Sequence, residues 1–366
     1  MGHTLPRRVP VKSLTDFCQH ALERVGVEPI DAAITAEVLV TADLRGVASH
    51  GVARFRRYIK GIRAHVIVVP HEERVVTETL ATATIDAGAG LGPPVSYRAM
   101  RKAIQKAAET GVGCVAVRNS NHFGIAGYYA MMALERDCIG LAMTNASPRV
   151  APTFGRSAML GTNPIAVAVP AGRMRPLVLD MATSIVAEGK VEMADRVGMP
   201  IPLGWALDKD GMPTTDSHRM VRNLKSRAGA ALLPLGGEGE LLGGHKGYGL
   251  ALWVEIFSAL LSGAAFATGT YPTNTAGEPL PANLGHWFGA WRIDCFRPVA
   301  EFKADMDDLQ ALLRNAPKAR GQKRIYFPGE KECEAIERNV REGIPLDDTT
   351  LSDLIALGQE LGVDLG

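Results

Sequence analysis

The sequence predicts an α/β protein in which helical segments from both chain ends flank an inserted α/β domain. Apolar residues recur with helical spacing in the first part of the chain and again near its end, whereas RVVTETLATATIDA alternates as strands do. Between them, short apolar runs end in polar clusters. We expect residues 1–72 and 300–366 to form a discontinuous helical domain, and residues 73–299 to form the second domain.

The composition argues against several classes of protein. The 366 residues suggest about two domains, and 40 basic against 39 acidic residues leave a net charge of +1. No basic block predicts binding to nucleic acid or a membrane surface, no apolar run has membrane-spanning length, and the N-terminus lacks the apolar run of a signal peptide. The five cysteines form no C-x-x-C pair, so we expect reduced thiols, a cytoplasmic location and no metal site.

Two helices are expected first. Ser13 and Asp16 resemble a capping box in front of the run FCQHALERV. Pro29 fits the first turn of the following helix, which Gly46 should end.

A third helix is expected to begin at Ser49 as N-cap. Spacing of four then places His50, Arg54 and Tyr58 on one face. A histidine titrates in a range suited to proton transfer, an arginine can bind a carboxylate with two donors, and Ser49 can orient the imidazole. A buried structural histidine is the alternative interpretation of His50.

Two glycine-rich stretches resemble nucleotide-binding loops without matching them. Residues 86–92, DAGAGLG, follow the predicted strand or hairpin and precede a helix expected from Ser96 to Thr110, but the glycines lack the G-x-G-x-x-G spacing. We interpret this stretch as a structural turn. No Ser or Thr follows Lys246, so GGHKGYG is not a P-loop.

Three apolar runs end in the polar clusters 118–122, 144–147 and 161–164. Strand ends that meet in one site and three ordinary surface turns both have this composition.

Asp180 ends a further strand and could hold a ribose hydroxyl or cap the next helix. Lys246 opens an apolar helix, where it could bind a phosphate or remain a solvated charge. The stretch 195–234 is expected to be irregular, and the chain should then continue with the strand HWFGAWRIDCF and three helices.

The order of the motifs SHGVARFRRYI, RNSNHFGIAGYYA, AMTNASP, LGTNPIA, VLDMATS, IPLGWALDKDG and GGHKGYGLAL resembles that of the malate/L-lactate dehydrogenase family. The resemblance extends over nearly the whole chain. It implies an NAD(P)-binding domain with a mixed, largely antiparallel sheet of non-Rossmann topology, NAD or NADP as cofactor, and a homodimer with sites near the subunit interface.

The resemblance also implies roles for individual residues. His50 would be the proton donor, with Ser49 as its relay partner and His122 as the competing acid/base candidate. Arg54, Tyr58 and Thr162 would face the substrate. The cofactor residues would be His122, Phe123, Gly124, Ser147, Asp180, Met181, Ala182, His245, Lys246, Pro328, Gly329 and Glu330. His245 departs from the tyrosine found in many relatives.

The expected activity is an NAD(P)-dependent 2-hydroxy acid dehydrogenase acting on malate. Lactate, sulfolactate or ureidoglycolate dehydrogenase and cyclic imine reductase are alternatives within the family. A hydrolase or lyase that uses Ser49 and His50 without a nucleotide is the alternative from another class, but no nucleophile-elbow motif supports it.

Overall fold

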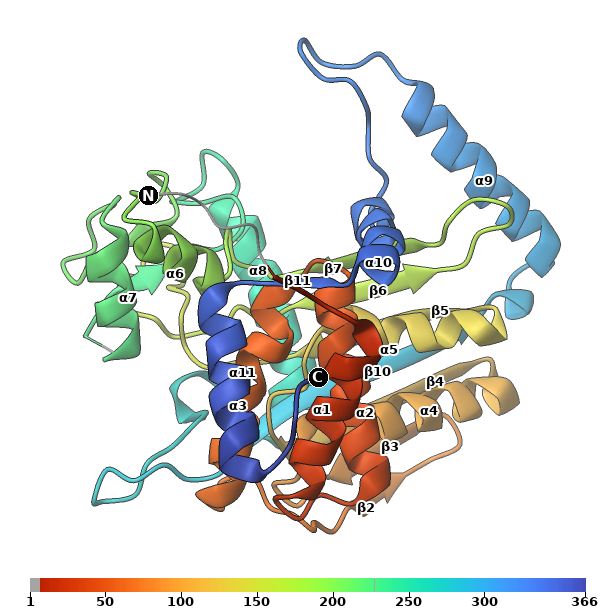
Figure 1. Cartoon of the computed structure of the whole chain (residues 1–366). Coiled ribbons are helices and arrows are strands. Elements are labelled where there is room, and N and C mark those ends of the chain that lie inside the picture. The colour runs from red at the N-terminus through yellow and green to blue at the C-terminus, as the bar shows by residue number, and fades with distance from the viewer. Residues whose placement is uncertain (1–6, 227) are drawn as a thin grey trace.

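The computed structural model describes residues 7–226 and 228–366. Within them, seven strands form one sheet in the order β2-β3-β4-β10-β5-β6-β7 (Figure 1). These strands are β2 (Arg74–Glu78), β3 (Thr82–Asp86), β4 (Val112–Ser120), β5 (Cys138–Thr144), β6 (Ile165–Val169), β7 (Leu177–Met181) and β10 (Leu284–Arg292). Two smaller sheets pair β1 (Arg7–Val9) with β11 (Ile344–Leu346) and β8 (Ala206–Leu207) with β9 (Ala231–Leu232). Residues 1–6 belong to the N-terminal segment for which we expect no signal peptide, and they lie outside the described residues.

The main sheet is mixed and largely antiparallel, as predicted. β3 and β4 are parallel, and the other neighbouring strands of this sheet run antiparallel. β2 and β3 form the predicted hairpin, and residues 86–92 turn the chain into the helix that connects β3 to β4. That helix begins at Gly92, before the predicted Ser96, because two prolines fit its first turn. Gly111 ends it with φ +87°.

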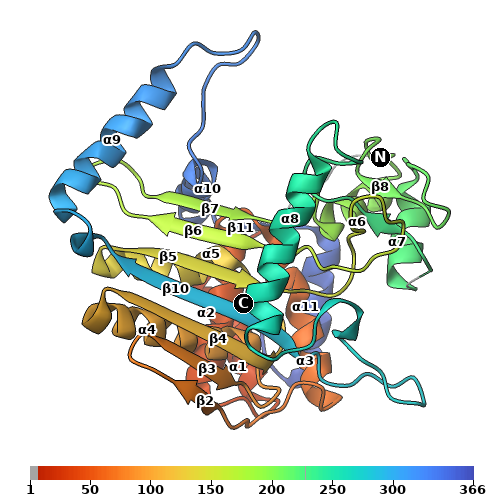
Figure 2. The same cartoon turned by 180° about the vertical axis from the view of Figure 1, so that it is seen from behind.

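Helices cover both faces of the sheet (Figures 1 and 2). They are α1 (Val11–Glu23), α2 (Pro29–Leu44), α3 (Phe55–Arg63), α4 (Gly92–Thr110), α5 (Ala126–Met132), α6 (Glu188–Arg196), α7 (Ser217–Lys225), α8 (Gly244–Glu255), α9 (Val299–Asn315), α10 (Glu330–Glu342) and α11 (Asp348–Leu361). Successive residues of β4 point to opposite faces of the sheet. Val115 and Val117 pack beneath α4 and α5, whereas Ala116 packs with Trp287 on the side of α8. None of the described helices is long and apolar enough to cross a membrane.

The two chain ends share a hydrophobic core. Phe17, Leu39 and Phe55 from the first three helices pack with Ile344 and Leu354 from the C-terminal segment. α9 contributes nothing to this core among the described residues (Figure 1). It packs instead beside the connection between β6 and β7, where Asp307 accepts the N–H groups of Gly172, Arg173 and Met174. The domain boundaries at residues 72/73 and 299/300 stay a prediction.

The start of α1 differs from the predicted capping box. The helix begins at Val11, and the carbonyl of Pro10 accepts the N–H of Leu14 at 3.1 Å. Asp16 forms an ion pair with Lys12, one turn earlier, instead of a capping bond at Ser13. The capping-box prediction is wrong because Pro10, with φ −57°, already sets the entry of the chain into the helix.

The stretch 195–234 is more ordered than predicted. α6, α7 and the β8–β9 pair enclose a small core that includes Val191, Met220 and Leu232. The prediction of an irregular excursion was wrong because the run SHRMVRNLK buries one side of a helix in this core.

Candidate functional site

The three polar clusters of the sequence meet at one edge of the main sheet. β4 ends at Ser120 and β5 at Thr144, and the antiparallel β10 begins between them. β7 ends at Met181 beside the start of β6. The structure therefore corresponds to the first of the two alternatives, in which strand ends gather side chains at one place.

A buried histidine ties two of these strand ends together. Nε2 of His286 lies 2.8 Å from Oγ of Ser120, and its Nδ1 lies 2.7 Å from Oγ1 of Thr144. The ring stacks on Phe123 with centroids 4.7 Å apart. Burial lowers the pKa of His286 to about 3, so this imidazole is neutral and structural.

A buried carboxylate ties the next clusters together. Glu255, 4% exposed, accepts hydrogen bonds from the side chains of Asn145 (3.3 Å) and Asn163 (2.6 Å) and from the N–H of Ala267 (2.8 Å). These bonds hold Asn145 and Asn163, which are close in sequence to Ser147 and Thr162. The positions of these two predicted site residues therefore depend on the buried Glu255.

Ser49 and His50 do not begin a regular helix. Two short 3₁₀ turns, Ala48–His50 and Val52–Arg54, precede α3, which starts at Phe55. The prediction that Ser49 caps α3 is therefore wrong, as is the placement of the following residues on one continuous α-helical face.

Asp43 is the physical reason for this break. Its buried carboxylate accepts the N–H of Val52 at 2.7 Å, which holds the chain between the two turns. A Cβ atom at Gly51 would lie 2.1 Å from a carboxylate oxygen of Asp43, so only glycine fits there. A long-range contact thus shapes the segment that carries His50.

Two histidines and two hydroxyl groups form the centre of the site. Oγ of Ser49 lies 2.9 Å from Nδ1 of His50, and the hydroxyl of Tyr58 lies 2.6 Å from Nδ1 of His122. The N–H of Gly124 also donates to Nδ1 of His122 at 3.4 Å. Because Nδ1 of His122 accepts a hydrogen bond, the proton of its neutral ring is on Nε2.

Burial and nearby cations keep both imidazoles neutral. Burial and the guanidinium groups of Arg54 and Arg57 lower the pKa of His50 to about 4. Burial, followed by the charges of Arg57 and of His50, holds the pKa of His122 well below its ordinary value. Burial is thus the main cause of the lowered pKa of His50, followed by the two arginines.

Arg54 lies beside Ser49 and beneath α6. Its Nε donates to the carbonyl of Ser49 at 2.8 Å, and its Nη2 lies 3.7 Å from Oε2 of Glu192. A Cβ atom at Gly189 would lie 3.1 Å from Cβ of Ser49, so α6 closes over this segment. The outer edge of the guanidinium is the part that a carboxylate could approach, in competition with Glu192.

Asp180 lies at the end of β7, the outermost strand of the sheet on that side. One of its carboxylate oxygens accepts the N–H of Gly127, in the first turn of α5, at 2.8 Å. Asp180 therefore caps a helix that precedes it in the chain, not the next helix. The residue as a whole is exposed, but burial of the carboxyl group raises its pKa above the ordinary value. The carboxylate oxygen that does not accept the N–H of Gly127 is the one left for a ligand hydroxyl. Met181 and Ala182, which follow it, are half-buried.

His245 and Lys246 are exposed in the first turn of α8 and lie near the same strand end. The carbonyl of Thr183 accepts the N–H of Leu235 at 2.9 Å. A Cβ atom at Gly247 would lie 2.1 Å from the carbonyl oxygen of Leu235, so α8 rests directly on this segment. Lys246 therefore lies in the same region of the structure as the residues that follow Asp180.

Two further predicted residues lie next to this segment. The carbonyl of Thr162 accepts the N–H of Thr183 at 2.9 Å. Ser147 follows Ala146, whose carbonyl would be 2.6 Å from a Cβ atom at Gly161. Thr162 and Ser147 are both half-buried.

The side chains of two predicted cofactor residues are used by the fold. Phe123 is 2% exposed and packs against His286. Glu330 is 5% exposed, accepts the N–H of Phe327 at 2.9 Å, and pairs with two arginines, Arg314 at 3.0 Å and Arg324. Pro328 and Gly329 lie against β7, where the carbonyl of Pro328 accepts the N–H of Val178 at 3.1 Å. Phe123 and Glu330 therefore offer a ligand mainly their backbone.

The sequence interpretation missed several residues that shape the site. Asp43, Glu255 and His286 act through contacts with residues distant in the chain, and no local pattern marks them. Arg57 could have been noticed because it immediately precedes Tyr58. In the described part of the chain, no group of three or more His, Cys, Asp or Glu side chains could hold a metal ion.

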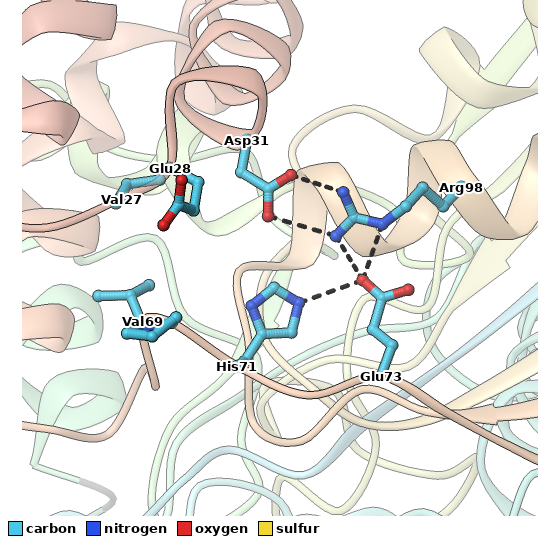
Figure 3. Close-up of a pocket in the computed structure, with 8 residues that line it drawn as sticks. Val27, Glu28, Asp31, Val69, His71, Glu73 and Arg98 are labelled. Carbon is cyan, nitrogen blue, oxygen red and sulfur yellow. Dashed lines mark hydrogen bonds and ion pairs between the residues drawn. The ribbon is translucent and has the colours of Figure 1, made fainter.

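A separate hollow lies between α2, the start of α4 and the segment 69–73 (Figure 3). Its volume is about 280 Å³, and Arg98 bridges Asp31 and Glu73 across it. His71 lies 3.1 Å from the same oxygen of Glu73. Asp31, Glu73 and Arg98 are engaged in one internal ion-pair network, and none of the predicted site residues lines the hollow.

Comparisons with known proteins agree with this architecture. The family model described as malate/L-lactate dehydrogenase matches residues 9–355. A malate dehydrogenase of Pyrococcus horikoshii is 44% identical over 98% of this chain and 96% of its own length. An L-sulfolactate dehydrogenase of Methanocaldococcus jannaschii is 40% identical, with 94% of each chain covered. The crystal structure of malate dehydrogenase from Entamoeba histolytica is similar with a TM-score of 0.94 and 37% identity, covering 98% of this chain and 99% of that one.

Proposed function

The chain belongs to the malate/L-lactate dehydrogenase family, and we propose that it is a malate dehydrogenase. As a member, it is an oxidoreductase that acts on 2-hydroxy acids with a nicotinamide cofactor. The observation that carries the choice of mechanism is the Ser49–His50 hydrogen bond beside Arg54. It places a base, its orienting group and a carboxylate-binding cation on one short segment.

We assign proton transfer to Nε2 of His50. With Nδ1 held by Ser49, the second nitrogen of the neutral ring can take the hydroxyl proton of malate and return it to oxaloacetate in the reverse reaction. Nε2–H of His122 would donate a hydrogen bond to the same substrate oxygen or hold the nicotinamide. His122 remains the competing proton carrier.

The substrate carboxylate next to the reacting carbon would bind Arg54. Its outer edge presents two parallel N–H donors, which match a carboxylate. Tyr58 would contribute by fixing His122, and Thr162 would face the substrate from the neighbouring strand end. Binding of an anion would also offset the arginine charges, so the pKa of His50 should rise when the substrate is bound.

The residues at the end of β7 and the start of α8 fit a nicotinamide dinucleotide. The carboxylate of Asp180 suits a ribose hydroxyl, and Lys246 in the first turn of α8 suits a phosphate. Gly124 has φ +84°, and a Cβ atom at this position would lie 2.5 Å from Cγ1 of Val38. The loop at His122 is therefore closely packed. The other predicted contacts are His122, Phe123, Ser147, Met181, Ala182, His245, Pro328, Gly329 and Glu330. When bound, the cofactor supplies hydride exchange with the carbon that bears the hydroxyl.

We expect NAD(H) to be preferred. A carboxylate that binds ribose hydroxyls repels a 2′-phosphate, and Asp180, at the end of β7, is a carboxylate placed to do so. Preference for NADP(H) is the alternative outcome.

The exposed face of α8 supports a homodimer. Trp253 is 37% exposed, Ile256 47% and Leu260 53%, so one side of this helix and of the turn after it presents apolar surface. We propose a second copy of the chain as its partner. A cytoplasmic location fits the five free cysteines among the described residues.

One assay panel tests the proposal. The purified protein would be given oxaloacetate, pyruvate, sulfopyruvate and cyclic imines with NADH or NADPH, and the loss of nicotinamide absorbance would be followed. We expect the highest kcat/KM with oxaloacetate and NADH. A cyclic imine as the best substrate, or no oxidation of either cofactor, would contradict a malate dehydrogenase.

A further inference from the structure

Arg57 is a cation at the site to which the mechanism assigns no role. It lies in α3, three residues after Arg54 and immediately before Tyr58, and it is exposed. Its guanidinium carbon lies 5.2 Å from the centre of the Tyr271 ring. Tyr271 raises the pKa of Arg57, and an arginine side chain is in any case always charged in proteins.

The charge of Arg57 acts on the catalytic centre itself. Among the cations it has the largest effect in lowering the pKa of His122, ahead of Arg54, and it also lowers that of His50. Tyr58, which bonds to Nδ1 of His122, is affected in the same way. The geometry agrees, because Arg57 directly precedes Tyr58 in α3, and the hydroxyl of Tyr58 lies 2.6 Å from Nδ1 of His122.

Tyr271 is held in an unusual backbone conformation. Its φ is +53°, which is rare for a bulky residue, and its N–H bonds to the carbonyl of Ala282 at 3.1 Å. The loop is anchored further by the bond between Ala267 and Glu255. The ring beneath Arg57 therefore belongs to the same fixed network as Thr162 and Ser147.

The acidic groups near the site are already paired with other cations. Glu192 lies 3.7 Å from Arg54, and Glu188 lies 2.7 Å from Arg149. Glu188 is the carboxylate whose charge contributes to the surroundings of Arg57, and the side-chain hydrogen bond of Arg57 runs to Tyr271. A charged, preorganised guanidinium that is oriented by a tyrosine, and whose neighbouring acidic groups pair with other cations, is suited to an anion from outside the protein.

We propose that Arg57, oriented by Tyr271, binds a second anionic group of the substrate at the end away from the reacting carbon. Arg54 would bind the carboxylate common to all 2-hydroxy acids, and Arg57 would select those with a further carboxylate or sulfonate. This inference rests on the proposed function, and it separates malate and sulfolactate from lactate. The group that we propose for Arg57 is a second carboxylate of the substrate. A sulfonate can replace it because it also carries a negative charge and acceptor oxygens.

The test compares three substrates in matched variants. The kcat/KM values for oxaloacetate, sulfopyruvate and pyruvate would be measured in the unmodified protein, Arg57→Gln, Arg57→Lys and Arg54→Lys. Arg57→Gln should lower kcat/KM for the two doubly anionic substrates by about 10- to 100-fold, mainly through KM, because a charge-assisted hydrogen bond is lost. Any effect of Arg57 on the two histidines is common to all three substrates, so the selective role is measured by the ratio of kcat/KM for oxaloacetate to that for pyruvate, which should fall about tenfold or more. Arg57→Lys, which keeps the charge, should fall between, and Arg54→Lys should impair all three substrates.

The outcomes distinguish this inference from the proposed function. Equal losses on all three substrates in Arg57→Gln would show that Arg57 serves the common chemistry or the fold, and would overturn the selective role. Unchanged ratios in both Arg57 variants would also overturn it while leaving a 2-hydroxy acid dehydrogenase intact. An unmodified protein that reduces none of the oxo acids would overturn both. Circular dichroism would check folding, and if Arg57→Gln unfolds, the substrate ratio in Arg57→Lys decides alone.

Discussion

The imidazole rings of His50 and His122 lie nearly parallel, with centroids 5.8 Å apart and planes inclined by 21°. The two rings come from segments far apart in the chain, and a different hydroxyl group engages Nδ1 of each, Ser49 for His50 and Tyr58 for His122. Each could therefore present Nε2 to one bound substrate. Their close approach also means that a charge on one ring disfavours a charge on the other, and the pKa of His122 is lowered in part by His50.

The first prediction separates the roles of the two histidines. If His50 carries the proton, His50→Gln should lower kcat by about 10² to 10⁴ in both directions and leave cofactor affinity nearly unchanged. His122→Gln should chiefly weaken cofactor or substrate binding. In malate oxidation, kcat/KM should fall as pH decreases through about 4, because protonation removes the base. Survival of that acidic limb in His50→Gln, with its loss in His122→Gln, would assign the proton to His122.

The second prediction concerns the carboxylate clamp. Arg54→Lys keeps the charge but loses the pair of parallel donors, and it should cost about 1 to 3 kcal/mol of transition-state binding, measured as kcat/KM. Arg56→Lys is the matched control, because Arg56 lies two residues later, in α3, and pairs with Asp353 and Glu360. An unchanged kcat/KM in Arg54→Lys would show that the carboxylate binds elsewhere.

The third prediction tests the cofactor site. Lys246→Ala should raise the Kd of the reduced cofactor, measured by calorimetry, more than it raises KM for the oxo acid, because a phosphate loses its cation. Lys12→Ala, an exposed change on α1, serves as control. Calorimetry that detects no nucleotide binding to the unmodified protein would refute the cofactor assignment.

The fourth prediction follows from the buried Asp43. Burial raises its pKa from 3.8 to about 7, so the unfolded chain releases this proton at lower pH than the folded protein does. Asp43 should therefore stabilise least above about pH 7. Between about pH 4 and pH 7, the free energy of unfolding should fall by a few kcal/mol relative to Asp43→Asn, which can still accept the bond from Val52. Denaturant titrations at several pH values would measure this. Asp210→Asn, an exposed change, should show no such trend, and a parallel pH dependence of the unmodified protein and Asp43→Asn would contradict the burial argument.

The fifth prediction concerns the partner of α8. Leu260→Glu should convert a dimer into monomers, because it would bury a charge in the proposed interface. Leu80→Glu, at a residue 79% exposed between β2 and β3, is the control and should remain dimeric. Light scattering after size exclusion would report the mass. A monomeric unmodified protein would rule out the homodimer.

Local sequence patterns predicted the order and type of most elements. The hairpin of β2 and β3, the end of α4 at Gly111, and the start of α2 at Pro29 all follow from local periodicity or from backbone preferences of single residues. The motif order also identified the family, and with it the sheet type. These features depend on neighbours in the chain, so a sequence pattern can record them.

Only the tertiary structure decided which segments meet and what electrostatic environment they create. β10 enters between β4 and β5, and His286 bonds to Thr144, which is 142 residues away in the chain. Asp43 breaks the helix that the spacing of His50 and Arg54 predicted, because its carboxylate occupies the space beside Gly51. Burial and cation distance set the pKa of His50, and neither quantity has a local signature in the sequence.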